Sequence, residues 1–306
     1  MAAPARASSM AEPSRSVVVA TYNALPWLEQ CLESVAGVET VVVDNGSTDG
    51  TVAFVRERFP SVAVVEQENL GLAAAWNRGV EASRDSDYVL ILNADAWLTA
   101  GSLDRLVEFA ESRPDAAVVG PRLLNPDGTL QRSVRGFPTP WRLATEYFFL
   151  RKLAPRSSLF NAFYAGGFDH DEVREAEFVM GACMLVRRGA IAQVGRLDEA
   201  FFLFSEETDW CYRFVQAGWT VLFYPGAECV HVGGASHGGT LYRENLRGHL
   251  RFLAKHRGAR SAERARRLLR VALVARGRLF PGERGRMYRD AATWLGTGDV
   301  PHLLER

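Results

Sequence analysis

Short apolar runs alternate with amphipathic stretches over the first 120 residues of the chain. The apolar runs predict β-strands over residues 16–20, 39–43, 61–65, 88–92 and 116–119. Helical spacing between them predicts helices over 27–35, 47–59, 71–82 and 102–112, with Ser47, Thr48 and Ser102 as N-caps. Strands that alternate with helices in this way are typical of parallel βαβ units. We therefore expect an α/β fold with a mostly parallel, twisted sheet flanked by helices.

This alternation stops after Gly120. Residues 125–128 read Asn-Pro-Asp-Gly and predict the turn of a hairpin, and residues 136–175 have no regular period. Regular structure is predicted again over 177–187, then a helix over 207–217 closed by Gly218, strands over 220–224 and 228–232, and helices from 242 to about 278. These last helices have an apolar stripe (Leu246, Leu250, Leu253) and a basic stripe (Arg243, Arg247, Arg251).

These patterns divide the chain into three regions. Residues 1–15 are rich in Ala, Pro, Ser and Arg and predict a disordered lead-in. Residues 16–240 form the expected α/β domain, with a nucleotide-binding half (16–120) and an acceptor or catalytic half (121–240). Residues 241–306 form a helical extension. The formal net charge of zero conceals a balance of −10 before residue 241 and +10 after it.

The basic extension predicts an anionic partner or an anionic membrane surface, although a solvated helical face or a homodimer contact would explain it as well. The four cysteines lack metal-ligand spacing, which predicts reduced, buried thiols and a cytoplasmic protein. No apolar run reaches the roughly 18 residues that a membrane span needs.

Polar clusters follow the first four predicted strands. They are Ala20-Thr21-Tyr22-Asn23, Asp44-Asn45-Gly46-Ser47, Asn69-Leu70-Gly71 and Asn93-Ala94-Asp95. The carboxyl ends of parallel strands share one edge of a sheet, where ligands bind in open α/β folds. Asp44 could hold a base or a ribose hydroxyl, and Asp95 could hold a divalent cation against a diphosphate. Each acid could instead cap a helix, but their joint placement favours a nucleotide site.

Two later features could complete such a site. Glu206, Glu207 and Asp209 lie at a helix start after an aromatic run, where apolar neighbours can raise the pKa of a carboxyl. The same acids would also favour the helix dipole. His231 ends an apolar strand before Gly-Gly-Ala-Ser and could be a metal ligand, although a single histidine is more often structural.

Missing motifs exclude several functions. No GxGxxG follows the first strand, which argues against a dinucleotide oxidoreductase, and no GxxxxGK[ST] occurs, which argues against a P-loop enzyme. A nucleotidyltransferase would need a glycine-rich, basic loop where this chain has TYNALPW. The acidic character of residues 1–240 argues against nucleic acid as a partner.

The combined motifs resemble those of family 2 glycosyltransferases with the GT-A fold, most of all a bacterial rhamnosyltransferase-like branch. The resemblance covers about residues 16–255. The segments that carry it are 16–23, 44–50, 68–71, 92–95, 180–185, 201–211 and 231–236.

This resemblance implies roles for individual residues. Those expected to bind the nucleotide sugar are Ala20, Thr21, Tyr22, Asn23, Asp44, Asn45, Ser47, Asn69, Gly71, Asn77, Asn93, Ala94 and Asp95. Asp95, in a DxD-like motif whose first acid is replaced by Asn93, would bind Mg²⁺ or Mn²⁺ together with His231. Glu206-Glu207 stands where the family has Glu-Asp, so Glu207 would be the catalytic base, with Glu206 and Asp209 as alternatives.

The expected reaction is an inverting, metal-dependent transfer from a nucleotide-diphosphate sugar, with dTDP-rhamnose as the first choice of donor. The basic extension suggests a polyprenyl-diphosphate-linked glycan as acceptor, at the inner face of the plasma membrane during cell-envelope polysaccharide synthesis. The alternatives are a UDP- or GDP-sugar enzyme with a soluble acceptor and a non-catalytic nucleotide-sugar-binding protein.

Overall fold

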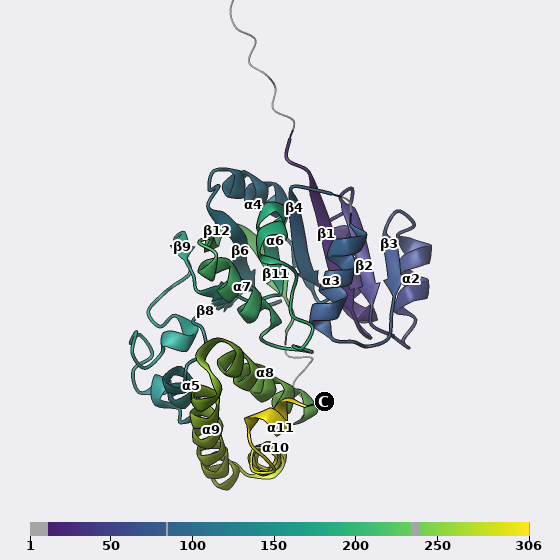
Figure 1. Cartoon of the computed structure of the whole chain (residues 1–306). Helices are drawn as coiled ribbons and strands as arrows, with labels where there is room; N and C mark the ends of the chain where they lie inside the picture. The colour runs from purple at the N-terminus through teal and green to yellow at the C-terminus, as the bar shows by residue number, and fades with distance from the viewer. Residues whose placement is uncertain (1–11, 84, 234–238, 306) are drawn as a thin grey trace, which may run out of the picture.

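An α/β domain lies beside a smaller unit of helices (Figure 1). The computed structural model describes residues 12–83, 85–233 and 239–305. Most of the expected lead-in, residues 1–11, lies outside these ranges, as do residues 234–236 of the Gly-Gly-Ala-Ser sequence. No helix in the described ranges is long and apolar enough to span a membrane.

The central sheet confirms the predicted α/β class. Its main path has the order β3-β2-β1-β4-β11-β6-β12-β5. These strands are β1 (Arg15–Thr21), β2 (Glu39–Asp44), β3 (Ala63–Glu66), β4 (Tyr88–Asn93), β5 (Ala96–Leu98), β6 (Ala116–Leu124), β11 (Cys183–Arg187) and β12 (Thr220–His231). β1 pairs in parallel with β2 and β4, and β2 pairs in parallel with β3. The first four strands therefore end at one common edge, as the alternating pattern predicted.

The second half of the sheet departs from the simple βαβ expectation. β11 runs antiparallel between β4 and β6, so the fourth and fifth predicted strands are not neighbours. The two strands expected over 220–232 are one long β12 with an irregularity between Tyr224 and Glu228. The predicted hairpin is confirmed, because β6 turns at 125–128 into the antiparallel β7 (Leu130–Gln131). The smaller strands are β8 (Val134–Arg135), β9 (Arg174–Glu175) and β10 (Phe178–Val179).

The helices that flank the sheet begin slightly differently from the prediction. They are α1 (Leu25–Glu33), α2 (Thr51–Arg58), α3 (Leu72–Ala82), α4 (Ser102–Glu111), α6 (Arg188–Val194) and α7 (Glu206–Gln216). Ser47, Thr48 and Ser102 are not N-caps: left-handed glycines precede α2 and α4 instead. The end of α7 is as predicted, because Gly218 has φ +90° and donates its N–H to the carbonyl of Val215.

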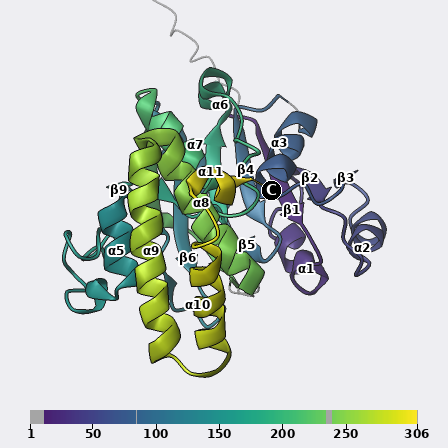
Figure 2. The same cartoon turned by 60° about the horizontal axis from the view of Figure 1, so that its bottom comes forward.

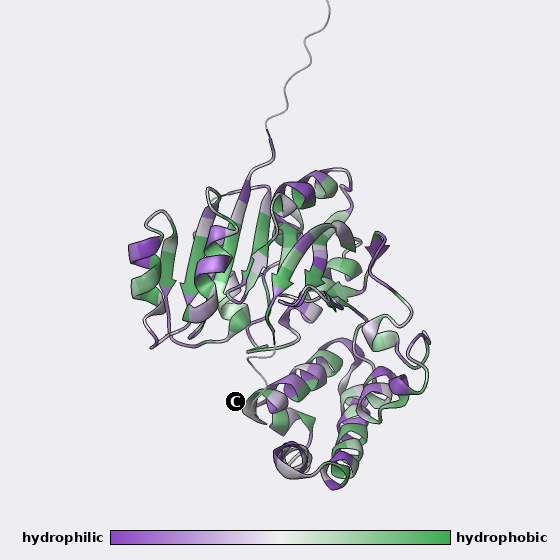
Figure 3. Cartoon of the chain, turned by 180° about the vertical axis from the view of Figure 1, so that it is seen from behind, coloured by the Kyte–Doolittle hydropathy of each residue, from purple (hydrophilic) through white to green (hydrophobic). Residues whose placement is uncertain are grey.

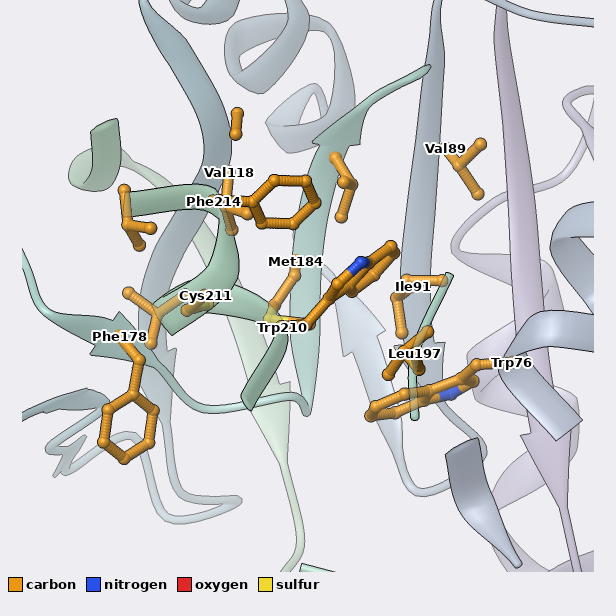
Figure 4. Close-up of a cluster of buried hydrophobic side chains, with 14 of the residues drawn as sticks. Trp76, Val89, Ile91, Val118, Phe178, Met184, Leu197, Trp210, Cys211 and Phe214 are labelled. Carbon is orange, nitrogen blue, oxygen red and sulfur yellow. The ribbon is translucent and has the colours of Figure 1, made fainter. Parts of the chain in front are cut away.

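Apolar clusters cover both faces of the sheet. One face packs α3, α6 and α7 around Trp76, Met184 and Trp210 (Figure 4). The other face packs α1 and α4. Because both faces are covered, β1, β2 and β4 are buried along almost their whole length. Figure 3 shows mostly hydrophobic residues along the strands of the sheet and a mixture of hydrophilic and hydrophobic residues along the helices. The four cysteines are free and buried, as predicted.

The helical unit has its own apolar core. It contains α5 (Pro140–Tyr147), α8 (Gly239–Arg257), α9 (Ala259–Leu279), α10 (Gly282–Trp294) and α11 (Val300–Leu304). The predicted apolar stripe of α8 is confirmed, because Leu246, Leu250 and Leu253 are fully buried. α10 and α11 lie within the helical extension predicted over 241–306, although the sequence patterns gave no separate bounds for them. The patterns missed α5, which lies in the segment expected to be irregular. Figure 2 shows α8, α9 and α10 beside one another.

Candidate active site at the carboxyl edge of the sheet

Two buried polar atoms at the ends of β1 and β2 have no partner. Thr21 and Asp44 are register partners, and both side chains are at most 2% exposed. One oxygen of Asp44 accepts the backbone N–H groups of Gly46 (3.0 Å) and Ser47 (2.8 Å). Its other oxygen and the hydroxyl of Thr21 lack a hydrogen-bond partner among the described residues. Buried polar atoms are normally paired, so these two atoms are suited to contact a ligand.

The neighbouring loops brace each other. The Ser47 hydroxyl accepts the N–H of Asn23, whose side-chain oxygen accepts the N–H of Thr48, both at 2.8 Å. Asn45 donates to the carbonyl of Gly71 (3.4 Å), and Asn69 accepts the N–H of Gly71 (3.3 Å). These side chains fix the shape of the edge.

Three of the expected sugar-nucleotide contacts differ in accessibility. Ala20 is buried in the strand, and Tyr22 is 55% exposed beside it. Asn77 is 4% exposed, and its amide is fully engaged: it accepts the N–H of Leu197 (2.9 Å) and donates to the Leu197 carbonyl and to Glu199. Its side chain ties α3 to the segment before α7, so Asn77 is a structural residue and we leave it out of the donor site.

Asp95 and His231 face one another across the sheet edge. β12 pairs with β5, which brings His231 Nε2 to 3.5 Å from Asp95 Oδ1. Asp95 also accepts the N–H of Gly233 at 3.3 Å. Burial acts to raise the pKa of Asp95, but the hydrogen bond and charge of His231 outweigh it, so the pKa is lowered. Asp95 is therefore an anion at neutral pH.

Gln131 decides how His231 is oriented. Its amide nitrogen donates to Asn125 (3.0 Å) and to the His231 carbonyl (3.2 Å), so its oxygen accepts from His231 Nδ1 at 2.7 Å. With the proton on Nδ1, the lone pair of Nε2 faces the carboxylate of Asp95. The pair is stable in two states: a ring protonated at both nitrogens donates to Asp95, which is the state that lowers the pKa of this carboxyl, and a neutral ring leaves room for a divalent cation between Nε2 and the carboxylate. This carboxylate and oriented imidazole fit a Mg²⁺ or Mn²⁺ ion.

A cavity of about 770 Å³, the first cavity, extends from this pair. Asn93, Asp95 and His231 line it, and so do Trp76, Glu206 and Glu207. Ala94 is buried behind Asn93. In the described ranges no third His, Cys, Asp or Glu joins Asp95 and His231 as a metal ligand. A bound cation would therefore keep coordination positions for ligand oxygens.

Glu206 and Glu207 begin α7, and the chain before them is strained. Phe204 and Ser205 both have positive φ, 69° and 70°, a rare conformation outside glycine that is concentrated at functional sites. One oxygen of each glutamate lacks a partner among the described residues. Burial, followed by the charge of Glu207, raises the pKa of Glu206. Burial also raises the pKa of Glu207, to about 7, although backbone N–H donors and Arg135 oppose the shift.

Asp209, the third acid of this helix, has a different environment. Its carboxylate is fully buried and contacts Arg213 (2.9 Å), Lys255 (2.7 Å) and His256 (2.7 Å). These contacts join α7 to α8. Asp209 therefore holds the helices together, while Glu207 has an unpaired oxygen and lines the first cavity, which leaves Glu207 as the better candidate for the predicted base.

Sequence reasoning missed Gln131, Arg135 and Trp76. All three line the first cavity. Gln131 and Arg135 lie in β7 and β8, the two short strands that follow the hairpin turn. Trp76 has the helical spacing of a core residue. No local pattern distinguishes such residues, because their roles depend on contacts with segments far away in the sequence.

Comparison with known proteins agrees with this geometry. Two solved structures share the fold: GalNAc-T7 with UDP, GalNAc and Mn²⁺ (TM-score 0.58, 16% identity, 79% of this chain and 48% of that chain) and the Pyrobaculum calidifontis mannosyltransferase PcManGT with GDP-Man and Mn²⁺ (TM-score 0.55, 17% identity, 96% and 85%). The chain therefore has the GT-A fold of glycosyltransferases.

Sequence comparison identifies the family. The sequence model for Glycosyl transferase family 2 matches residues 16–195, and the chain belongs to this family. A curated relative from Mycobacterium tuberculosis, N-acetylglucosaminyl-diphospho-decaprenol L-rhamnosyltransferase, is 34% identical over 231 residues, which is 70% of this chain and 75% of that protein. The hexosyltransferase Agl10 of Haloferax volcanii is 26% identical over 203 residues, 65% of this chain and 60% of that protein. The protein is a family 2 glycosyltransferase, as the motifs predicted.

Proposed function

We propose that this enzyme transfers rhamnose from dTDP-rhamnose to a hydroxyl of a polyprenyl-diphosphate-linked sugar, with inversion at the anomeric carbon. The observation that carries the proposal is the position of Glu207. One oxygen of its carboxylate has no partner, and Glu207 lines the first cavity together with Asp95 and His231 and also lines a second cavity beside the helical unit. The name of the mycobacterial relative supports the choice of donor sugar and acceptor.

The donor would lie along the carboxyl edge of the sheet. Thr21 and Asp44 offer unpaired oxygens for the nucleoside, and Asp95 with His231 would hold a divalent cation at the diphosphate. The cation supplies Lewis-acid stabilisation of the leaving diphosphate when it is bound. Mn²⁺ in two solved structures with this fold supports the use of a divalent metal.

Glu207 would act as the general base. Its carboxylate takes the proton of the acceptor hydroxyl, the hydroxyl oxygen forms the new bond to the anomeric carbon, and the bond to the diphosphate breaks with its electron pair. Attack on the face of the anomeric carbon away from the departing diphosphate gives inversion. A base whose pKa is raised towards the working pH is well suited to this proton transfer.

The outer face of α9 supports a membrane location at the inner face of the plasma membrane. Exposed arginines of this helix are Arg260, Arg264, Arg267, Arg270 and Arg278. The exposed apolar residues Leu268 (36%), Val271 (60%) and Leu279 (73%) lie on the same helix. Basic and apolar side chains together favour binding to anionic headgroups. We refer to these eight residues as the basic face.

A transfer assay tests the enzymatic proposal. Purified protein is incubated with Mg²⁺ or Mn²⁺, a short-chain lipid-diphosphate N-acetylglucosamine and, in turn, dTDP-rhamnose, UDP-sugars and GDP-sugars. A disaccharide product with dTDP-rhamnose, inverted at the new linkage by NMR, is the expected outcome. Product only with a UDP- or GDP-sugar would overturn the donor assignment, and binding of every donor without transfer would favour the non-catalytic alternative.

Vesicle co-sedimentation tests the basic face. The wild type should bind vesicles with anionic lipid at low salt and lose binding at high salt, because screening weakens surface charges. Glu replacements at Arg267, Arg270 and Arg278 should reduce binding, whereas Arg56→Glu, on α2, should not. Equal binding by all variants, or none at low salt, would contradict the assignment, and concentration-dependent cross-linking through these positions would favour a homodimer contact.

A further inference from the structure

The second cavity lies where the helical unit meets the glycosyltransferase domain. Its volume is about 570 Å³, and its walls come from α5, α7, α8, α9, α10 and the segment around Phe163. Several residues, among them Arg135, Tyr164 and Glu207, line both cavities. The two cavities therefore meet at the proposed base, and a molecule in the second cavity can present a hydroxyl to Glu207.

Three unpaired polar atoms surround this cavity. They are a carboxylate oxygen of Glu207, the hydroxyl of Tyr242 and Nδ1 of His249. Each is buried and makes no hydrogen bond of normal geometry with a described residue, although the Tyr242 hydroxyl interacts with the guanidinium of Arg276. The His249 side chain is 7% exposed, and burial lowers its pKa to about 4, so its ring is neutral. Buried polar atoms without partners are uncommon in native proteins, and three around one cavity indicate a ligand rich in hydroxyl or amide groups. A sugar has this chemistry.

Arginines line the same cavity. Arg276 is 6% exposed; it donates to the carbonyls of Glu146 and Tyr147, and its guanidinium lies 3.9 Å from the ring centroid of Phe149. Arg284, which is exposed, donates to the hydroxyl of Tyr288 at 3.1 Å. In the described ranges, neither guanidinium has a carboxylate within 4.0 Å, and neither does that of Arg135.

The acidic residues of the cavity do not balance these three cations. Glu146 forms an ion pair with Arg151, and Glu207 is the remaining carboxylate of the wall. Three guanidinium groups with so little local negative charge favour an anionic ligand, and arginine is well suited to phosphate oxygens. The exposed Arg284 places some of this positive charge where the cavity meets solvent.

Close packing couples this wall to the catalytic segment. A Cβ on Gly248, in α8, would lie 2.7 Å from the carbonyl oxygen of Phe204 and 2.8 Å from the hydroxyl of Ser205. α8, which carries Tyr242 and His249, therefore lies directly against the strained residues that precede Glu206 and Glu207. The position of the helical unit and that of the base are set together.

We propose that the second cavity is the acceptor site, with the acceptor's sugar at Glu207, Tyr242 and His249 and its diphosphate at Arg276 and Arg284. The inference rests on the proposed function, because it assumes that the acceptor is a sugar diphosphate. It assigns acceptor recognition to the carboxyl-terminal helices, outside the residues matched by the family model.

Acceptor binding tests the inference without any donor. Calorimetry measures binding of short-chain lipid-diphosphate N-acetylglucosamine and of the matching glycoside without phosphates. Arg284→Gln should weaken binding of the diphosphate compound at least about tenfold and leave the glycoside unchanged, because a phosphate contact is a charge-assisted hydrogen bond. Tyr242→Phe should weaken both compounds by a similar factor. Arg257→Gln, an exposed arginine of α8 outside the cavity, is the matched control.

Kinetics separate this inference from the proposed function. Both variants should raise the KM for the acceptor and leave donor affinity unchanged, with thermal unfolding at the wild-type temperature. If the wild type transfers rhamnose but neither variant changes acceptor binding or KM, the acceptor site is wrong while the function stands. If the wild type does not use dTDP-rhamnose but binds the diphosphate acceptor through Arg284, the function as proposed is wrong while this site stands.

Discussion

The two cavities on either side of Glu207 differ in charge. The first is bordered by strand ends and carries Asp95 beside an oriented imidazole, an arrangement that favours a cation. The second is bordered by helices and carries arginines with aromatic rings, an arrangement that favours an anion. Arg135 lines both cavities, so the difference lies in the metal-binding pair of the first and in Arg276 and Arg284 of the second. One glutamate therefore borders a candidate cation site and a candidate anion site, an arrangement that suits a transfer in which both the donor and the acceptor carry a diphosphate.

The largest expected effect comes from removing the group that the cavities share. Glu207→Gln keeps the side-chain shape but cannot accept a proton, so kcat should fall by about 10²–10⁴-fold. Donor affinity in calorimetry should stay near the wild-type value. Glu206→Gln, at a carboxylate that lines only the first cavity, is the control and should lose less activity. Wild-type turnover by Glu207→Gln would remove this residue from the role of base.

A second prediction concerns only the proposed metal-binding pair, Asp95 and His231. Asp95→Asn should remove the metal-dependent component of donor affinity, because a neutral amide binds a divalent cation more weakly than a carboxylate does. Gln131→Ala should cost less, about 10–100-fold in metal affinity, because it only releases the ring of His231. Titrations with Mn²⁺ and with EDTA measure both effects. Donor affinity that is the same with and without chelator in the wild type would contradict the metal site.

A third prediction concerns pH. Glu207 acts as a base only when it is ionised, and burial raises its pKa to about 7. Activity should therefore rise with pH through the neutral range and fall roughly tenfold for each pH unit below the pKa. The measurement is kcat/KM against pH at saturating metal. A rate that stays constant down to pH 5 would indicate that no raised carboxyl limits the reaction.

The smallest expected effect tests how α8, which lines the second cavity, packs against the segment before Glu206. Gly248→Ala should destabilise the protein by about 1–3 kcal/mol, because the added methyl group would overlap the backbone of Phe204. Activity should fall with it, since the base follows directly after this segment. Gly189→Ala, in α6, is the matched control, because a Cβ there meets nothing within 4 Å. Equal unfolding temperatures for the two variants would argue against close packing of α8 on this segment.

Local sequence patterns predicted much of the first cavity. The apolar runs located β1, β2 and β4, and the polar residues after them reached the expected edge, because strand direction and side-chain alternation are local properties. Patterns were less informative for helix starts: Gly50 and Gly101, rather than serines, precede α2 and α4. Helix α5 was missed because it is short, spanning residues 140–147, and because it lies in an aromatic segment without a clear hydrophobic period.

The roles of individual polar residues were harder to predict. Asn77 has the kind of polar side chain that often binds ligands, but this side chain accepts a hydrogen bond from the backbone N–H of Leu197, 120 positions away. Asp209 and Glu207 lie two positions apart in one helix, yet it is Asp209 that contacts Lys255 and His256 of α8. Such partners are far away in the sequence, so the residues around each polar side chain do not predict them.

Short-range patterns in the chain were enough to predict the first strands and the edge of the sheet that carries Asp44 and Asp95, and the resemblance of the motifs to a known family predicted the family. Which polar atoms stay unpaired became evident only in the folded molecule. That outcome depends on contacts between distant segments, such as His231 with Gln131 and α8 with the start of α7. The second cavity has no sequence motif for the same reason: its walls come from separate helices that meet only when the chain has folded.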